Sequence, residues 1–598
     1  MKTFRGQSAL LLVALLTGRV VAEEVDAAKV DAAAADPRNV KAGFVIPDEG
    51  YCDQPYVVVT KDGNWLCVLT TGPGREGQRG QHVVSTISKD KGRTWSKPLD
   101  IEPSDGPEAS WVTPLLTPGG RVYAFYDYNG DQISTLNNKP IRADMLGCYC
   151  YRFSDDHGAS WSAERYRLPM RVTACDRAND WQGKVQIFWG ISKPIASDGA
   201  AILAFSKLGK HLLDQGEGWF FRSDNLLTET DPNRLRWELL PDGEHGVRHE
   251  SFGSIQEEHN VVSLSGDDLY CIYRTTTGHP CQSYSRDGGR SWTEPEHSTY
   301  SPGGSKFKHP RACPKIWRTA AGRYLLWFHN YAGHTFDGRN PAWICGGLEK
   351  DGMLHWSQPE ILLYDEDPKV RMSYPDLIEQ DARYWVTETQ KTVARVHEID
   401  AALLEGMWRQ LESDGKSAPG KLPTSTASFS AAELAGGRAR VPRLTAGQGF
   451  SLAMQFRLGD LAAGQALVNA TDGSGRGWQA RTVDDGRLEI VLSDGKTFAR
   501  WASDPGLIKS GRTQHVVITV DGGPKTITFV VDGKVCDGGP DQPCGWGRFD
   551  AALVDAYAER EPALRSAPSA APARLQIFDR PLRNYEAVAL ARAAAERP

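Results

Sequence analysis

The segment Glu257–Trp292, EEHNVVSLSGDDLYCIYRTTTGHPCQSYSRDGGRSW, carries the pattern that decides the fold. It contains an alternating strand, a tight polar turn at Gly266-Asp267 and a second apolar strand that ends in Arg274. The remainder closes with the form S-x-D-x-G-x-x-W, which we call the Asp turn. Asp and Ser can bond to the backbone amides of such a turn, Gly can adopt positive φ, and Trp can pack between strands. The segment therefore predicts a β-hairpin followed by a turn whose aspartate is structural.

This pattern repeats along the chain. The Asp turn occurs intact twice more, at Ser88–Trp95 and Ser154–Trp161, and in a degraded form around Asp351 and Trp356. The strand-turn-strand pattern recurs in six segments, which begin at Pro55, Val112, Lys193, His259, Cys313 and Tyr374. A further strand pair follows each member. Six copies of about four strands predict a six-bladed β-propeller.

The C-terminal part of the chain has a different organisation. An apolar stripe at helical spacing predicts a helix over Ala401–Leu411, after which residues 412–426 form a linker rich in Pro, Gly, Ser and Lys. From 427 to 598, alternating strands are joined by Asp-Gly and Gly-Gly turns. This part resembles the laminin-G and concanavalin-like jelly rolls, which often bind carbohydrate. The predicted fold class is all-β, with a six-bladed β-propeller over 44–411 and a β-sandwich over 427–598.

The N-terminus predicts export. Lys2 and Arg5 precede an apolar run over Ala9–Leu16, and small residues end at Ala22, as in a cleaved signal peptide. Residues 1–22 are therefore assigned to the signal peptide and 23–43 to a leader. We expect a secreted or periplasmic protein with no membrane insertion, because no later apolar run reaches membrane length.

Composition and cysteine spacing limit the possible ligands. The net charge is −6 and the basic residues are not clustered, so the sequence does not indicate a nucleic-acid-binding surface. The count of 11 cysteines is odd for an exported chain, and Cys536 and Cys544 flank a short loop that a disulfide could close. Since no CxxC pair or His/Cys cluster has zinc spacing, neither a metal nor a cofactor is expected.

Three segments carry a more specific resemblance. EEHNVVSLSGDDLYCIYR, GRNPAWICGGLEKDG and MSYPDLIEQ, together with the Asp turns and hairpins, resemble the exo-α-sialidases (neuraminidases) of the six-bladed class, over about Phe44 to Glu398. The resemblance implies that Glu258 is the glutamate of the site and that Arg274 is a carboxylate-binding arginine. It also implies that Arg339 is a second carboxylate-binding arginine and that Tyr374 is the nucleophile.

The chemistry of a sialoside explains these residue types. Its anomeric carbon carries a carboxylate, which arginines can clamp through charge-assisted hydrogen bonds. That carboxylate would repel a carboxylate nucleophile, whereas a phenol deprotonated by a neighbouring glutamate can attack without starting as an anion. Glu258 and Tyr374 are the expected pair.

Two positions depart from the family pattern. Where the family has Arg-Ile-Pro before its first hairpin, this chain has Asp53-Gln54-Pro55, and the position of the acid/base aspartate falls on His82. We expect the changes to compensate, because Asp53 can orient a His82 imidazole that acts as general acid or base. The alternative is a structural role, in which a hydrogen bond between Asp53 and His82 only closes the blade. Arg79 and Arg311 are candidates to replace the missing arginine.

The sequence therefore predicts an exo-glycosidase, an exo-α-sialidase that hydrolyses terminal sialic acid from glycans. Its expected partner is a sialylated or otherwise acidic glycan, and the sequence makes no prediction of oligomeric state. Two alternatives stay open. One is a hydrolase or polysaccharide lyase for another acidic sugar, and the other is a glycan-binding propeller without catalysis.

Overall fold

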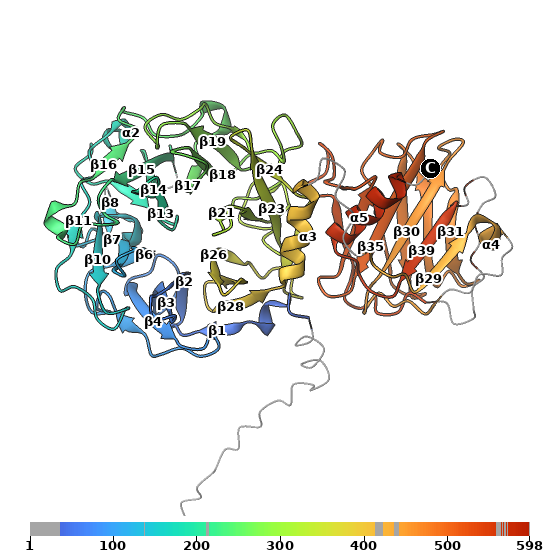
Figure 1. Ribbon diagram of the computed structural model, residues 1–598, viewed down its shortest axis with the longest axis horizontal. Helices are drawn as coiled ribbons and strands as arrows, with labels where there is room; N and C mark the ends of the chain where they lie inside the picture. The colour runs from blue at the N-terminus through green and yellow to red at the C-terminus, as the bar shows by residue number, and fades with distance from the viewer. Residues whose placement is uncertain are drawn as a thin grey trace, which may run out of the picture.

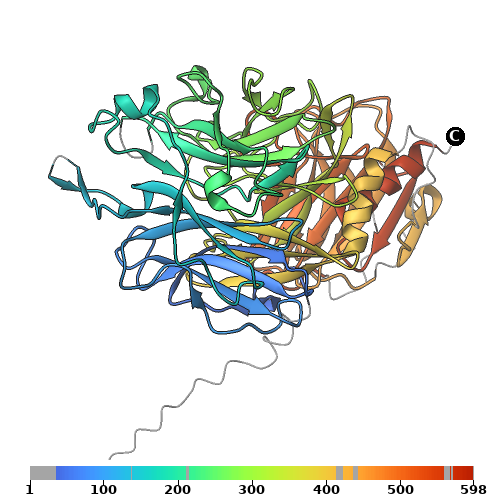
Figure 2. The ribbon, with the colours of Figure 1, turned by 60° about the vertical axis from the view of Figure 1, so that its left-hand side comes forward.

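The computed structural model describes residues 36–136, 138–210, 214–412, 422–435, 442–557, 564, 566, 570 and 572–596. The predicted signal peptide and the leader as far as residue 35 lie outside this part. The fold is all-β, as predicted, with six sheets around a central axis and a β-sandwich on one side (Figure 1). The turned view in Figure 2 shows the same two bodies packed together. None of the helices in the described ranges is long and apolar enough to cross a membrane.

The six sheets are the blades of the propeller. Blade one contains β2 (Tyr51–Val59), β3 (Trp65–Gly72), β4 (His82–Ser88) and β5 (Leu99–Asp100). Blade two contains β6 (Ala109–Leu116), β7 (Val122–Tyr128), β10 (Cys148–Ser154) and β11 (Tyr166–Arg167). Blade three contains β12 (Ile187–Trp189), β13 (Ile195–Ser197), β14 (Ala200–Leu208), β15 (Glu217–Ser223) and β16 (Glu238–Leu240). Short elements between them are β8 (Thr135–Leu136), β9 (Lys139–Pro140), α2 (Ala174–Ala178) and the 3-10 turns η2 (Ala143–Met145), η3 (Pro232–Arg234) and η4 (Glu250–Phe252).

Blades four to six follow the same antiparallel order. Blade four contains β17 (Gln256–Ser263), β18 (Leu269–Thr275), β19 (Cys281–Ser285) and β20 (Glu296–His297). Blade five contains β21 (Lys315–Arg318), β22 (Tyr324–Phe328), β23 (Ala342–Lys350), β24 (Met353–Trp356) and β25 (Glu360–Leu363). Blade six contains β26 (Ser373–Gln380), β27 (Arg383–Thr389) and β28 (Ala394–Ile399). The last blade is completed by β1 (Phe44–Ile46), which follows the 3-10 turn η1 (Val40–Ala42) and pairs with β28. The ring is therefore closed by strands from both ends of the propeller.

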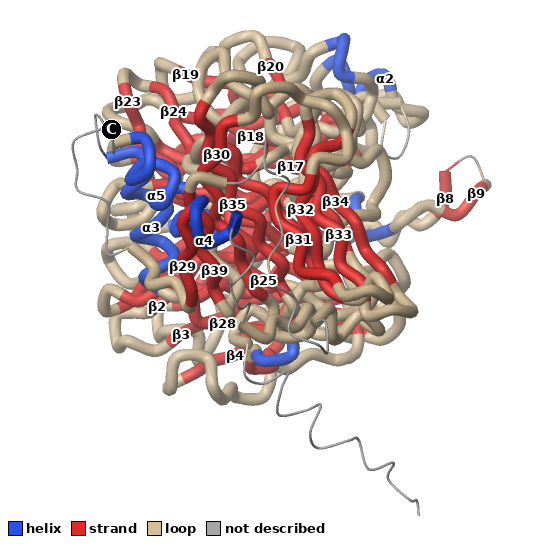
Figure 3. Tube along the Cα trace, turned by 90° about the vertical axis from the view of Figure 1, so that its right-hand side faces the viewer, coloured by secondary structure: helices blue, strands red, loops and turns tan. Residues whose placement is uncertain are grey.

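The C-terminal domain is a two-sheet sandwich. One sheet contains β29 (Ala427–Ser430), β30 (Phe450–Arg457), β35 (Thr513–Asp521), β36 (Thr526–Val531), β37 (Lys534–Val535), β38 (Trp546–Arg548) and β39 (Arg574–Phe578). The other contains β31 (Ala466–Thr471), β32 (Gly477–Val483), β33 (Arg487–Ser493) and β34 (Phe498–Ala502). Side chains from both sheets form one apolar core, and Figure 3 shows the strand groups side by side. Two helices, α4 (Ala431–Ala435) and α5 (Asn584–Ala595), complete the domain.

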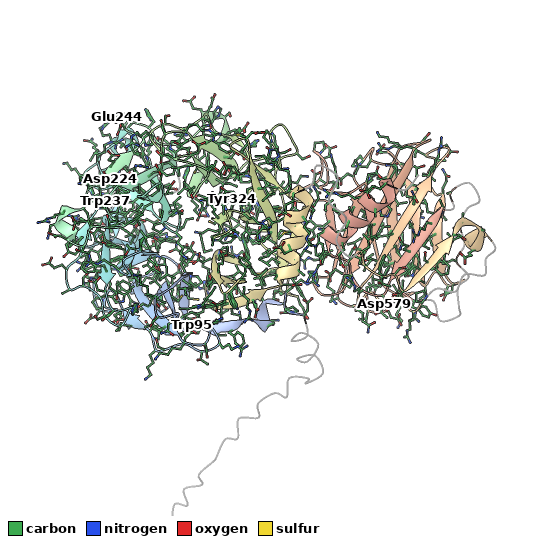
Figure 4. All side chains as sticks on the ribbon, in the orientation of Figure 1. Trp95, Asp224, Trp237, Glu244, Tyr324 and Asp579 are labelled. Carbon is green, nitrogen blue, oxygen red and sulfur yellow. The ribbon has the colours of Figure 1, made fainter. Side chains whose placement is uncertain are left out.

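The Asp turns are self-contained, as the sequence predicts. In the first turn, the Ser88 hydroxyl donates to Asp90 at 2.9 Å and accepts from the Gly92 amide at 2.8 Å. Asp90 in turn accepts from the Thr94 amide at 2.8 Å. Trp95 is labelled at the outer edge of the propeller in Figure 4. The aspartates of these turns satisfy the local backbone, and the site lies elsewhere.

The propeller and the sandwich share a polar interface. The predicted helix is α3 (Ala401–Glu412), which lies between the propeller and α5 (Figure 1). The Arg38 guanidinium bonds Asp521 at 2.6 Å across the interface. The Glu360 carboxylate accepts from the Asn584 amide at 3.1 Å and from the Tyr585 amide at 2.6 Å at the start of α5. These bonds satisfy buried charges and free amides that either domain alone would leave unpaired.

The disulfide that Cys536 and Cys544 could form is not present. All 11 cysteines are free thiols. Cys536 packs in the core of the sandwich, whereas Cys544 packs in an apolar cluster of the propeller and donates its thiol to the Trp546 carbonyl. The two side chains therefore face different cores, although the loop between them is short.

Candidate functional site

Bulges on two inner strands set the direction of the site residues. The pairing of β17 shifts between Glu257 and Asn260, and the pairing of β26 shifts between Ser373 and Asp376. Within these bulges Glu258 has φ +57° and Tyr374 has φ +45°, which are unusual for residues with a Cβ. A bulge re-aims side chains that regular alternation would place on a fixed face. Blade six and blade four thereby bring their side chains into contact.

Tyr374 and Glu258 form the centre of the site. The Tyr374 hydroxyl donates to Glu258 Oε1 at 2.7 Å, and both side chains are buried. Burial raises the pKa of Tyr374 well above its usual value, the Glu258 charge adds to this rise, and Arg274 opposes it. The resting pair is thus a neutral phenol bonded to a carboxylate acceptor. This is the arrangement in which a carboxylate can take the phenolic proton during attack.

Arg274 is already neutralised by two carboxylates. Its Nη1 lies 2.8 Å from Glu258 Oε1, and its Nη2 lies 2.7 Å from Glu257 Oε2. Burial lowers the pKa of Arg274, but Glu258 and Glu257 outweigh this effect and hold it above its usual value. Arg311 Nη2 lies 3.3 Å from the same Glu257 oxygen. Glu257 therefore ties two arginines together beneath the Tyr374–Glu258 pair.

Arg339 differs from Arg274 and Arg311 because it has no counter-ion among the described residues. Its Nη1 donates to the Ser373 hydroxyl at 2.7 Å and its Nη2 to the Arg311 carbonyl at 2.6 Å, while its Nε has no partner there. Burial lowers the pKa of Arg339 from its usual value, since desolvation of the cation is not offset by a salt bridge. The ring of Phe336 lies 5.5 Å from its guanidinium. A buried cation with a free donor beside a nucleophile is suited to bind an anion.

A second polar cluster borders Tyr374 on the side of blade one. Lys391 Nζ lies 2.5 Å from Asp53 Oδ2, 3.2 Å from Glu76 Oε2 and 4.4 Å from the centroid of the Tyr374 ring. Asp53 also accepts from the Tyr51 hydroxyl at 2.9 Å. Burial raises the pKa of Asp53 to about 6, although Lys391 opposes the rise. For Glu76 burial acts in the same direction, but Lys391 and Arg142 outweigh it and lower the pKa to about 2.

The expected Asp53–His82 pair is not formed. His82 is opposite Thr71 across the β3–β4 ladder, whereas Asp53 is opposite Thr70 across the β2–β3 ladder. Side chains one position apart in register point to opposite faces of a sheet, so the imidazole and the carboxylate are separated by the blade. His82 Nε2 instead lies 3.4 Å from Asp100. The structure gives no contact of His82 with the cluster around Tyr374, and its catalytic role stays a prediction.

The two candidate replacements for the missing arginine have different surroundings. Arg311 lies at the site, bound to Glu257, with its guanidinium 4.6 Å from the Phe336 ring centroid. Arg79 is exposed and donates to the Ser134 hydroxyl at 3.1 Å. Thus Tyr374, Glu258, Arg274, Arg339 and Arg311 come together, and Asp53 lies beside them through Lys391.

Sequence reasoning missed Lys391, Glu76 and Glu257. Lys391 lies in the turn after β27, the second strand of the hairpin that Tyr374 opens. The rule that points to loops after such strands could have found it. Glu76 lies in the loop between β3 and β4, and nothing in its glycine-rich surroundings marks it. Among the described residues, no group of three or more His, Cys, Asp or Glu could hold a metal ion.

Comparison with family models places two known domains in the chain. Residues 108–386 match the BNR repeat-like domain, and residues 433–581 match the concanavalin A-like lectin/glucanases superfamily. The chain therefore contains a BNR repeat-like domain followed by a concanavalin A-like domain, which agrees with the BNR-repeat and laminin-G-like parts of the resemblance found in the sequence. A search of curated proteins finds no significant match.

Several solved structures are similar in fold at low sequence identity. A protein of unknown function from Dyadobacter fermentans has 17% identity and a TM-score of 0.45, covering 60% of this chain and 98% of that one. A point mutant of NanB sialidase from Streptococcus pneumoniae has 13% identity and a TM-score of 0.42, covering 61% and 71%. Trypanosoma rangeli sialidase in complex with 2,3-difluorosialic acid has 12% identity and a TM-score of 0.45, covering 93% and 97%. Similarities at this level do not assign an activity.

Proposed function

We propose that the protein is an exo-α-sialidase, a glycoside hydrolase that removes terminal sialic acid from glycans. The observation that carries the proposal is the 2.7 Å hydrogen bond from Tyr374 to Glu258 beside Arg339, a buried cation without a counter-ion in the described part of the chain. A phenol with a carboxylate acceptor suits attack at an anomeric carbon that itself bears a carboxylate. Arg339 supplies the charge that holds this carboxylate.

In the proposed reaction, Glu258 accepts the Tyr374 proton as the phenolic oxygen attacks the anomeric carbon. The bond from that carbon to the leaving oxygen breaks, and the leaving oxygen takes a proton from the Asp53–Lys391–Glu76 cluster. Asp53 is the proton donor, since its pKa of about 6 keeps part of it protonated under mildly acidic conditions. A water molecule then gives its proton to Asp53 and attacks the glycosyl-tyrosine bond, and Glu258 returns its proton to Tyr374.

Lys391 takes the place of the missing third cation in this proposal. Replacing it by Met is expected to lower kcat/KM roughly tenfold, a typical loss for one charge-assisted contact. The alkaline limb of the pH profile should also move to higher pH, because Asp53 must be protonated to act as the donor and Lys391 lowers the pKa of Asp53. The pH dependence of kcat/KM measures both effects.

Lys91→Met is the matched control for this variant. Lys91 Nζ also pairs with a carboxylate, Asp381, at 2.7 Å and lies 5.7 Å from the Trp385 ring centroid, but on the far side of the blades. The control should leave the pH profile unchanged. An unshifted profile for Lys391→Met would remove Lys391 from the site.

The activity itself is tested by release of sialic acid. The protein is incubated with α2,3- and α2,6-sialyllactose, and free sialic acid is quantified by chromatography. Wild-type protein should release it, and Glu258→Gln should not at a comparable rate. No release from either linkage by wild-type protein would contradict the proposal.

One observation favours a second candidate, a hydrolase or lyase for a different acidic sugar. Glu257 neutralises both Arg274 and Arg311, and Asp53 stands where the sialidase family has an arginine. Only Arg339 is then free to meet a substrate carboxylate. A uronic acid, whose carboxylate is attached to ring carbon C5 and not to the anomeric carbon, is the competing substrate, and an unsaturated product would identify a lyase.

A further inference from the structure

A segment of the sandwich lies against the propeller loop that carries Arg339. The segment is Cys536–Arg548, which contains β38, and the loop is Asn330–Pro341, which joins β22 to β23 in blade five. We call them the sandwich segment and the arginine loop. Between its ends, the arginine loop presents Phe336 and Arg339 to the site. Its ends are the places where the sandwich makes contact.

The start of the arginine loop is held by two hydrogen bonds to the sandwich segment. The Trp546 indole N–H donates to the Asn330 carbonyl at 2.9 Å, and the Ala332 amide donates to the Pro543 carbonyl at 2.7 Å. Nearby, the Lys308 ammonium donates to two carbonyls of the sandwich segment, those of Gly539 at 2.6 Å and Gln542 at 2.5 Å.

The end of the arginine loop is held by one guanidinium. Arg548 Nη2 donates to the Asn340 carbonyl at 2.9 Å, next to Arg339 in the chain. The Asn340 amide side chain also donates to the carbonyls of Asp365 at 2.9 Å and Asp367 at 2.8 Å. The residue beside Arg339 is thus fixed from the sandwich on one side and from blade five on the other.

Apolar side chains of the sandwich segment also pack into the core of the propeller. Cys544 and Trp546 belong to the same buried cluster as Phe328 and Trp343 of blade five, and the rings of Trp343 and Trp546 are 6.2 Å apart. A ring buried in a neighbouring domain's core has few alternative positions. The sandwich segment is therefore a rigid support for the arginine loop.

From these contacts we infer that the sandwich positions Arg339 for anion binding, with Arg548 and Trp546 as the positioning residues. Arg339 has no carboxylate partner among the described residues, and its guanidinium is held by the Ser373 hydroxyl and the Arg311 carbonyl alone. Keeping it at these two acceptors therefore requires the backbone of its loop to stay in place. An error of about 1 Å at a binding group can cost roughly 100-fold in rate. The catalytic part of this inference rests on the proposed function, whereas the support of the loop does not.

The test compares Arg548→Met and Trp546→Phe with wild-type full-length protein. Each variant keeps apolar volume and removes one donor to the arginine loop. Hydrogen exchange measured by mass spectrometry should become at least severalfold faster across 330–341, with blades one to three unchanged. In the Tyr374→Phe background, which prevents turnover, the Kd for α2,3-sialyllactose should rise roughly tenfold, as expected for loss of one hydrogen bond to a charged group.

Asp521→Asn is the matched control. It removes an interdomain ion pair with Arg38 on the same interface and leaves both donors to the arginine loop, Trp546 and Arg548, in place. The control should leave exchange across 330–341 at the wild-type rate. The inference is overturned if Arg548→Met and Trp546→Phe leave that exchange unchanged, or if Asp521→Asn accelerates it equally. Faster exchange together with no sialyllactose binding by any protein would keep the support of the loop and reject the proposed substrate.

Discussion

Replacing Tyr374 by Phe is expected to reduce kcat roughly 1,000-fold or more while leaving substrate binding within a few-fold of wild type. The substitution removes only the phenolic oxygen that attacks the anomeric carbon, and loss of a nucleophile has effects of this size or larger. Glu258 keeps its bond to Arg274 at 2.8 Å, so no buried carboxylate is left unpaired. Removing one hydrogen bond should therefore lower the free energy of unfolding by only about 1 kcal/mol.

Tyr384→Phe is the matched control for this prediction. Tyr384 lies in the same blade and also donates to a glutamate, Glu379, at 3.3 Å, but its ring packs beside Trp408 of α3. Steady-state kinetics on sialyllactose and thermal unfolding should separate the two variants. If Tyr374→Phe kept a tenth or more of the wild-type kcat, the tyrosine would not be the nucleophile.

Replacing Arg339 by Met is expected to weaken binding of an acidic sugar roughly 100-fold, because truncating one partner of a buried charge pair costs about 2–5 kcal/mol. The same change should leave the unliganded protein equally stable or make it more stable. In wild type, burial of the Arg339 cation is not offset by a counter-ion, and burial lowers the pKa of Arg339 accordingly. Loss of binding with gain of stability is the signature expected of a residue kept for ligand binding.

Calorimetric titration with sialyllactose and with its carboxyl-reduced analogue, in the Tyr374→Phe background that prevents turnover, measures this effect. The 100-fold loss should apply only to the acidic ligand, since the reduced analogue offers no charge to Arg339. Arg311→Met gives a comparison in which the cation lost is already paired with Glu257. Equal loss for both ligands would show that Arg339 supports the shape of the site and does not bind the carboxylate.

The fold was predictable because its signals are local. Each Asp turn satisfies its own backbone within a few residues, and each hairpin is marked by alternation on both sides of a turn. The contact between Tyr374 and Glu258 joins residues 116 positions apart, and it was predicted only through the resemblance to sialidases. No local pattern specifies such a contact.

The errors have a physical cause in register and long-range packing. His82 was placed beside Asp53 by counting along a strand, but one position of register moves a side chain to the other face. Lys391, which bonds Asp53, lies 338 positions away along the chain. Long-range packing also decides that Cys536 and Cys544 do not pair, because the cores that receive the two side chains belong to different domains.

The central claim is that Tyr374 attacks the anomeric carbon of a sialoside. The most direct test is to incubate the protein with 2,3-difluorosialic acid, the compound bound in the Trypanosoma rangeli sialidase complex, and to map any adduct by peptide mass spectrometry. The account predicts one covalent adduct on the peptide that contains Tyr374, absent from the Tyr374→Phe protein. An adduct on another residue, or sialic acid release by a protein that forms no adduct, would contradict it.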